Sequence, residues 1–149
     1  MRTAVTPVSR KLFLLIAVLA LAGIVVSSVA LHNHYAKSKS TYCDFGENFN
    51  CDVVNRSQYS VIVGIPVALI GILGYVLLLG LSTLYRHSEE APTLLLAAAV
   101  PGLAFALYLT YVEGFILSAW CILCLSSLVF ISAITVLSAV LLIYSRRDS

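Results

Sequence analysis

Four long stretches of the chain are apolar and contain no charged side chain, and they constrain the fold more than any other feature. They lie at about residues 12–31, 61–85, 93–111 and 119–144. Each has about the 20 residues that a helix needs to cross the hydrocarbon core of a bilayer. The chain is 60% hydrophobic and 11% charged, which is more apolar surface than a soluble domain of this size can bury. We therefore expect an all-α integral membrane protein, a single four-helix bundle over residues 1–149.

The first apolar stretch also has features of a secretory signal. Basic residues precede it, and Ser28-Val29-Ala30 resembles a cleavage site. Its apolar run is longer than the roughly 7–15 residues usual in a signal peptide, which favours a retained helix.

The connections between the expected helices differ in length. Arg86–Pro92 and Val112–Ser118 are short, which is typical of links between antiparallel neighbours. The segment at about 32–60 is too long for a simple turn, so we expect one long outer loop after the first helix. The net charge of +2 is small and divided among termini and loops, so we expect membrane lipid and no nucleic acid as a partner.

Basic residues near the membrane ends predict the orientation. With four spans, both termini share a side, and six Lys and Arg residues fall on it against three on the other. The two groups are Arg2, Arg10, Lys11, Arg86, Arg146 and Arg147 against Lys37, Lys39 and Arg56. We expect the termini in the cytoplasm, and the long loop with the start of the fourth helix in the periplasm or an equivalent lumen.

All four cysteines then lie on the oxidising side, where disulfides persist. Cys43 and Cys51 belong to the loop, and Cys121 and Cys124 form a Cys-X-X-Cys motif near the outer end of the fourth helix. Residues three apart on a helix are neighbours, so a modest adjustment would let the helix pair form a disulfide. A helix N-terminus also favours the thiolate. Cys121 lies nearer the surface and a loop thiol, whereas Cys124 lies deeper, within reach of a lipid-soluble molecule.

Two other uses of the cysteines remain as alternatives. The first is a non-catalytic membrane scaffold with structural disulfides, although a bond within one helical turn closes too short a loop to stabilise much. The second is a zinc site, which the seven-residue gap between Cys43 and Cys51 fits poorly. We therefore expect redox-active cysteines and no metal.

The order of the cysteines, a widely spaced loop pair and then Cys-X-X-Cys opening the fourth helix, resembles the vitamin K epoxide reductase family. Cys51-Asp-Val-Val-Asn-Arg-Ser57 looks like the loop cysteine of that family with a serine six residues on. Gly64-Ile-Pro-Val-Ala-Leu-Ile-Gly71 looks like the start of the second helix in its bacterial members. The resemblance extends over essentially all of residues 12–144.

This resemblance implies a membrane thiol:quinone oxidoreductase. A reduced thioredoxin-like partner would pass two electrons to a Cys43–Cys51 disulfide, and Cys51 would then attack the helix pair at Cys121. Cys124 would be freed to reduce a quinone, ubiquinone or menaquinone, bound among the outer ends of the helices. The resemblance also implies that Ser57 hydrogen-bonds a redox group.

The same resemblance implies a setting in the bacterial inner membrane, where the enzyme reoxidises a periplasmic dithiol oxidase and so drives disulfide formation in exported proteins. Many bacterial members carry a fused thioredoxin-like domain. This sequence stops five residues after Tyr144, so we expect the partner in trans. The alternative is an endoplasmic-reticulum quinone or vitamin K epoxide reductase with the same relay. Leu128 stands where the animal enzymes carry a tyrosine, which favours the quinone.

Small residues on the second helix and Trp120 are candidate quinone contacts. Gly64, Ala68 and Gly71 form a small-residue stripe with Gly74 close by; close helix packing is the favoured interpretation, and a flat wall for a quinone ring is the alternative. For Trp120, an aromatic belt at the membrane surface is the favoured interpretation, and a place in the lining of the quinone pocket is the alternative.

Glu113 follows the third apolar stretch, at its outer end. We expect a solvated carboxylate at the membrane surface. Assistance in protonating a quinone is the alternative.

Overall fold

A computed structural model describes residues 7–35, 61–118 and 120–147, and this part of the chain is mostly helical, with one small hairpin and short connections before Ala91 and Ile122. The elements are α1 (Pro7–Tyr35), β1 (Val61–Ile62), β2 (Ile65–Pro66), α3 (Val67–Thr83), α4 (Ala91–Tyr111), the π-helix η2 (Val112–Leu117) and α5 (Ile122–Arg147). The all-α expectation is therefore confirmed for the described residues. Residues 36–60, which make up most of the expected outer loop, lie outside them.

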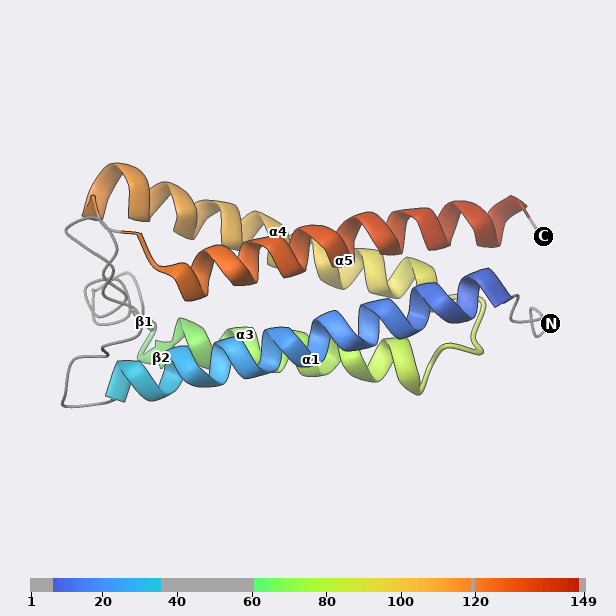
Figure 1. Ribbon diagram of the computed structural model, residues 1–149, viewed down its shortest axis with the longest axis horizontal. Coiled ribbons are helices and arrows are strands. Elements are labelled where there is room, and N and C mark those ends of the chain that lie inside the picture. Colours follow the sequence, from blue (N-terminus) through green and yellow to red (C-terminus); the bar gives the residue numbers. More distant parts are fainter. Residues whose placement is uncertain (1–6, 36–60, 119, 148–149) are drawn as a thin grey trace.

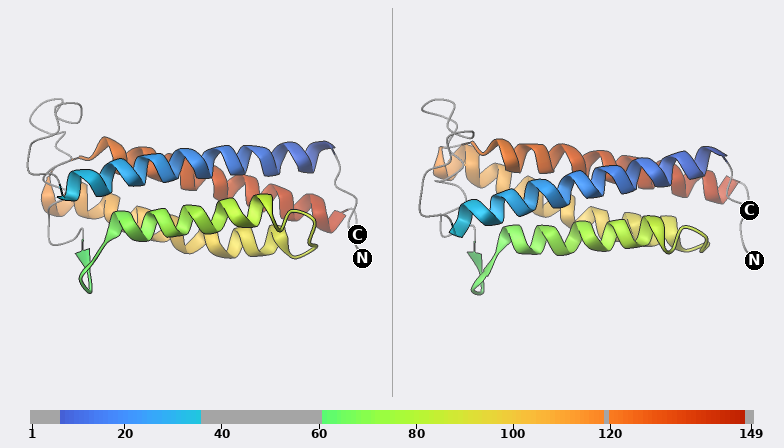
Figure 2. Two further views of the ribbon diagram at one scale, coloured as in Figure 1. Left: turned by 90° about the horizontal axis from the view of Figure 1, so that it is seen from below. Right: turned by 60° about the horizontal axis from the view of Figure 1, so that its bottom comes forward.

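The four long helices form an antiparallel bundle (Figure 1). In it, α1 contacts α3 and α5, and α4 also contacts α3 and α5, so the helices close into a ring. The further views in Figure 2 show the same arrangement, with α1 beginning and α5 ending at one end of the bundle. The core contains buried residues from every helix, among them Phe13, Ile16, Ala20, Tyr75, Leu78, Leu95, Ala99, Ile131 and Ile134. The start of α1 and the end of α5 share one end because the bundle has four antiparallel helices.

Three helical segments are long and apolar enough to cross a membrane, namely Pro7–His32, Ala91–Ile116 and Ile122–Arg147. Large apolar side chains such as Leu14 and Val129 point outward on these segments, as a lipid-facing surface requires. The fourth helix of the bundle, α3, is an apolar helix of 17 residues, with a length of about 26 Å against a hydrocarbon core of about 30 Å. The chain is an integral membrane protein.

The second helix begins later than predicted, because Val61 pairs with Pro66 in an antiparallel hairpin and α3 starts only at Val67. Both residues of the two-residue turn have a positive φ, 52° at Val63 and 81° at Gly64. That combination matches the turn that best joins two twisted strands. Glycine adopts it freely and valine rarely does. The predicted start at residue 61 was wrong because an apolar run suits a strand as well as a helix.

The third predicted connection, Val112–Ser118, is mostly helical and is not the turn that the sequence suggested. The helix continues from α4 through Val112–Leu117 as η2, and Ser118 ends it with a left-handed φ of 52°. A π-helix is wider than an α-helix and often occurs at functional sites. Its effect here is to place Glu113 within the wall of the bundle, where the sequence had suggested a surface loop.

Candidate functional site

The Cys-X-X-Cys motif lies at the N-terminus of α5. Cys121 directly precedes the helix, and its carbonyl accepts a hydrogen bond of 3.0 Å from the backbone N–H of Leu125. Cys121 therefore holds the N-cap position, and Cys124 lies in the first turn. Both are free thiols; Cys121 is buried and Cys124 is half-buried. The two side chains lie within interaction range of each other, so the predicted juxtaposition of this pair is present.

The surroundings of Cys121, which precedes the membrane-spanning segment of α5, lower the pKa of its thiol. The main cause is the hydrogen bond with the Cys124 side chain, and the backbone N–H groups of Cys124 and Leu123 add to it. Burial and the nearby Glu113 carboxylate oppose the shift. Free backbone N–H groups at a helix N-terminus stabilise a thiolate. The thiolate is the form that exchanges with disulfides.

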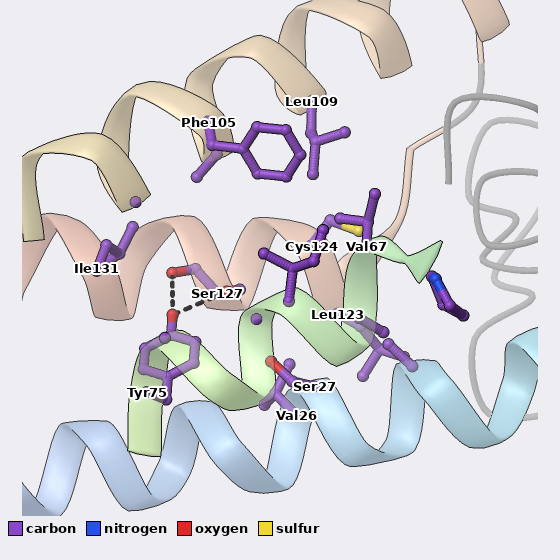
Figure 3. A pocket seen from close by; sticks show the side chains of 18 of the residues that line it. Val26, Ser27, Val67, Tyr75, Phe105, Leu109, Leu123, Cys124, Ser127 and Ile131 are labelled. Carbon is purple, nitrogen blue, oxygen red and sulfur yellow. Dashed lines mark hydrogen bonds between the residues drawn. The ribbon is translucent and has the colours of Figure 1, made fainter. Parts of the chain in front are cut away.

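A cavity of about 350 Å³ lies among the helices next to this pair, with Cys124 on its wall (Figure 3). All four long helices contribute to it. The lining includes Val26 and Ser27 of α1, Val67, Ala68, Gly71, Gly74 and Tyr75 of α3, Pro101, Gly102, Phe105 and Leu109 of α4, and Leu123, Ser127 and Ile131 of α5. The walls are mostly apolar, and the volume lies within the range of about 300–1,000 Å³ typical of small-molecule sites.

Tyr75 and Ser127 supply polar groups on the cavity wall. The Tyr75 hydroxyl donates to the carbonyl of Ser127 at 3.0 Å. It also lies 2.8 Å from Ser127 Oγ, and it can accept from that hydroxyl while its own proton is donated to the carbonyl. Figure 3 draws both bonds, which tie α3 to α5 beside the cavity. The Tyr75 ring packs against Gly23 of α1 so closely that a Cβ there would overlap it.

Glu113 is the charged group of the site. Its side chain is 1% exposed and lines the same cavity as Cys124. Oε2 accepts a hydrogen bond of 3.2 Å from the backbone N–H of Cys121. Oε1 is buried and has no hydrogen-bond partner within the described part of the chain. The expectation of a solvated surface carboxylate is therefore wrong, because the helix continues through η2 and carries Glu113 inward.

Other predicted residues lie outside the description or away from the cavity. Cys43, Cys51 and Ser57 fall in residues 36–60, outside the described residues. Gly64 lies in the exposed hairpin turn. Trp120 packs against η2, where a Cβ on residue 114 would lie 3.0 Å from the indole ring. Neither Gly64 nor Trp120 is among the residues that line the cavity, so its geometry does not support their predicted contact with a quinone.

The small-residue stripe of α3 serves two purposes. At Gly71 a Cβ would lie 3.0 Å from Ser27 Oγ, which indicates close packing of α3 against α1. At Gly74 a Cβ would meet nothing within 4 Å, and this glycine lines the cavity. The favoured packing interpretation therefore applies to Gly71, and the alternative of an open wall applies to Gly74.

Sequence reasoning missed Tyr75 and Ser127 and misjudged Glu113. Signals for two of them were present. Tyr75 brings a hydroxyl into the middle of an apolar stretch, and Glu113 is the single charged residue of Ala91–Ile116. Polar and charged groups at such positions are costly in a membrane and usually mark function. As for metals, no three His, Cys, Asp or Glu side chains gather among the described residues in a way that could hold an ion.

A family comparison agrees with this geometry. The model of the vitamin K epoxide reductase family matches residues 14–139, which include all of α3 and α4, most of α1 and α5, and all four cysteines. No curated protein sequence matches the chain. Members of the family are membrane oxidoreductases that act with quinones or vitamin K. With most of its length matched, and with its paired thiols beside an apolar cavity, this chain belongs to the vitamin K epoxide reductase family.

Proposed function

We propose that the protein is a membrane thiol:quinone oxidoreductase that supports disulfide bond formation. The observation that carries this proposal is the position of Cys124, which adjoins the N-cap thiol of Cys121 on one side and lines an apolar cavity on the other. A dithiol in that place can give its electrons to a lipid-soluble acceptor held in the cavity.

The cavity suits the flat, apolar ring of a quinone, either ubiquinone or menaquinone. Phe105 and Leu109 supply apolar surface opposite Cys124 (Figure 3). Gly74 of α3 and Pro101 and Gly102 of α4 line the cavity and are also exposed. The small residues on these two helices offer a route from the lipid into the cavity, between α3 and α4.

In the proposed relay, a thioredoxin-like periplasmic dithiol oxidase in trans reduces a Cys43–Cys51 disulfide. The Cys51 thiolate then attacks Cys121 in a Cys121–Cys124 disulfide, which forms a Cys51–Cys121 bond and releases the Cys124 thiolate, and this thiolate takes up a proton. Cys43 attacks Cys51, restores the loop disulfide and frees Cys121. The reduced helix pair passes two electrons to the quinone. The lowered pKa of Cys121 supports its place in this exchange, because a low-pKa thiol is the better leaving group.

We place the protein in the bacterial inner membrane with its termini in the cytoplasm, so that the start of α5 faces the periplasm. The excess of basic residues on the side of the termini supports this orientation.

The test is quinone reduction by the purified full-length protein, with a reduced thioredoxin-like partner and a soluble quinone, followed by the absorbance of the quinone. We expect turnover in the wild type and none in Cys124→Ala, with the melting temperature of the variant close to that of the wild type. Ser126→Ala is the matched control, because it changes a half-buried residue of the same helix turn that does not line the cavity. Its turnover should equal that of the wild type.

Unchanged quinone reduction in Cys124→Ala would contradict the proposal. A structural scaffold predicts another pattern, namely no turnover in the wild type and a lower melting temperature in Cys121→Ala and Cys124→Ala. Replacing the quinone with vitamin K epoxide tests the remaining alternative, since an epoxide reductase would turn over the epoxide faster than the quinone.

A further inference from the structure

The unpaired oxygen of Glu113 is unusual for a membrane helix. A buried polar atom normally has a hydrogen-bond partner, and leaving one without a partner costs free energy. Glu113 is 1% exposed and belongs to an apolar span, yet only Oε2 is bonded, to the backbone N–H of Cys121 at 3.2 Å. Oε1 has no partner among the described residues. Such an atom at a cavity wall suggests a group that completes its bonding only when a ligand or a proton arrives.

The position of Glu113 identifies the reaction that it can serve. The carboxylate lines the cavity together with Cys124, and the side chains of these two residues lie within interaction range of each other. Its other oxygen is fixed by Cys121. The carboxylate therefore adjoins both reacting thiols and the space for the acceptor. We propose that Glu113 carries a proton from the Cys124 thiol to the bound quinone, an inference that rests on the proposed function.

The overall reaction moves two protons as well as two electrons. Oxidation of the two thiols breaks the S–H bonds of Cys121 and Cys124, forms one S–S bond and releases two electrons and two protons. The quinone takes up both electrons and forms two O–H bonds. Glu113 accepts the proton of Cys124 as the electron pair leaves that sulfur for the quinone, then donates it to one quinone oxygen and returns to its starting state. The proton of Cys121 is released to water when that thiol ionises, and the other quinone oxygen takes up an equivalent proton.

A purely structural role for Glu113 makes a different prediction. If its only task is to accept the Cys121 N–H, glutamine serves as well, because the amide oxygen accepts the same hydrogen bond at nearly the same size. Proton transfer needs the carboxyl group itself. General acid–base groups typically contribute about 10²- to 10⁴-fold to a rate, so Glu113→Gln separates the two roles clearly.

The experiment uses the full-length protein, reduced with dithiothreitol and mixed without oxygen with a soluble quinone in a stopped-flow instrument. We expect the single-turnover rate of quinone reduction in Glu113→Gln to fall by about 100-fold or more. The quinone concentration for half-maximal rate, the rate of reduction by dithiothreitol and the melting temperature should stay within about two-fold or a few degrees of the wild type. Glu90→Gln, an exposed carboxylate at the opposite end of α4, is the matched control and should leave every readout unchanged.

A Glu113→Gln rate within two-fold of the wild type would overturn the inference, and so would an equal slowing of the dithiothreitol step, which indicates a structural role. If Glu113→Gln lowers the melting temperature, Glu113→Asp distinguishes proton transfer from a structural role, because aspartate keeps the carboxyl group. Proton transfer predicts an Asp variant faster than the Gln variant, and equal loss in both contradicts it. Failure of the wild type to reduce any quinone would instead refute the proposed function.

Discussion

The substitution Gly74→Leu tests whether the cavity holds the quinone. A Cβ at Gly74 would meet no atom within 4 Å, and the same is true of Gly80 on the same helix. Replacing either glycine with leucine should therefore fit and should favour the helix by roughly 0.8 kcal/mol. Only Gly74 lines the cavity, so only its leucine occupies space that the quinone needs.

The size of the effect follows from the four carbon atoms of the leucine side chain. If each displaces one quinone carbon from an apolar contact worth about 0.8 kcal/mol, the loss of binding free energy is about 3.2 kcal/mol, and half that displacement costs about 1.6 kcal/mol. The KM for the quinone should therefore rise roughly 15- to 200-fold in Gly74→Leu.

The assay measures quinone reduction at varied quinone concentration, together with the melting temperature of each variant. Gly80→Leu should keep the KM of the wild type, and neither variant should melt at a lower temperature. An unchanged KM in Gly74→Leu, or an equal rise in Gly80→Leu, would refute the assignment of the cavity as the quinone site.

Two further substitutions test the packing and the thiol chemistry of the site. Gly23→Ala should destabilise the protein by about 1–3 kcal/mol, because its Cβ overlaps the Tyr75 ring and must displace it from Ser127; a melting temperature equal to that of the wild type would show that the ring has room to move. Alkylation of reduced Cys121 by iodoacetamide, followed by peptide mass spectrometry, should reach half its maximal rate at a lower pH than an ordinary thiol does, since the pKa of Cys121 is lowered. Cys124→Ala should raise that midpoint by removing the main cause of the shift, and identical midpoints in the two proteins would contradict this explanation.

The membrane helices were predictable because a lipid-facing helix must be apolar over a length set by the bilayer. The residues at which the helices begin and end were harder to predict. The run from Val61 to Pro66 is apolar, and only Gly64 and Pro66 hinted at a turn and a strand before the helix. In the other direction, Val112–Leu117 contains a glycine and a glutamate that suggested a surface connection, but the structure keeps this segment helical.

The cysteine pair was predictable from spacing, whereas the cavity was not. A soluble helix reveals its inner face through a polar outer face. The membrane helices here are apolar on all sides, so periodicity gave no means of telling that Phe105 and Leu109 line a cavity while Leu107 faces outward. The interaction of Glu113 with Cys121 depends on the extra helical turn of η2. The local sequence pattern did not predict that this segment is helical.

The central claim is that the helix pair reduces a quinone, and a single turnover tests it most directly. The double variant Cys43→Ser/Cys51→Ser isolates Cys121 and Cys124. After reduction and removal of the reductant, it is mixed with excess quinone in the absence of oxygen, and quinol is measured together with the free thiols of both residues. We predict one quinol per chain and one Cys121–Cys124 disulfide. Both thiols remaining free with no quinol formed, or quinol formed without loss of these thiols, would contradict the account.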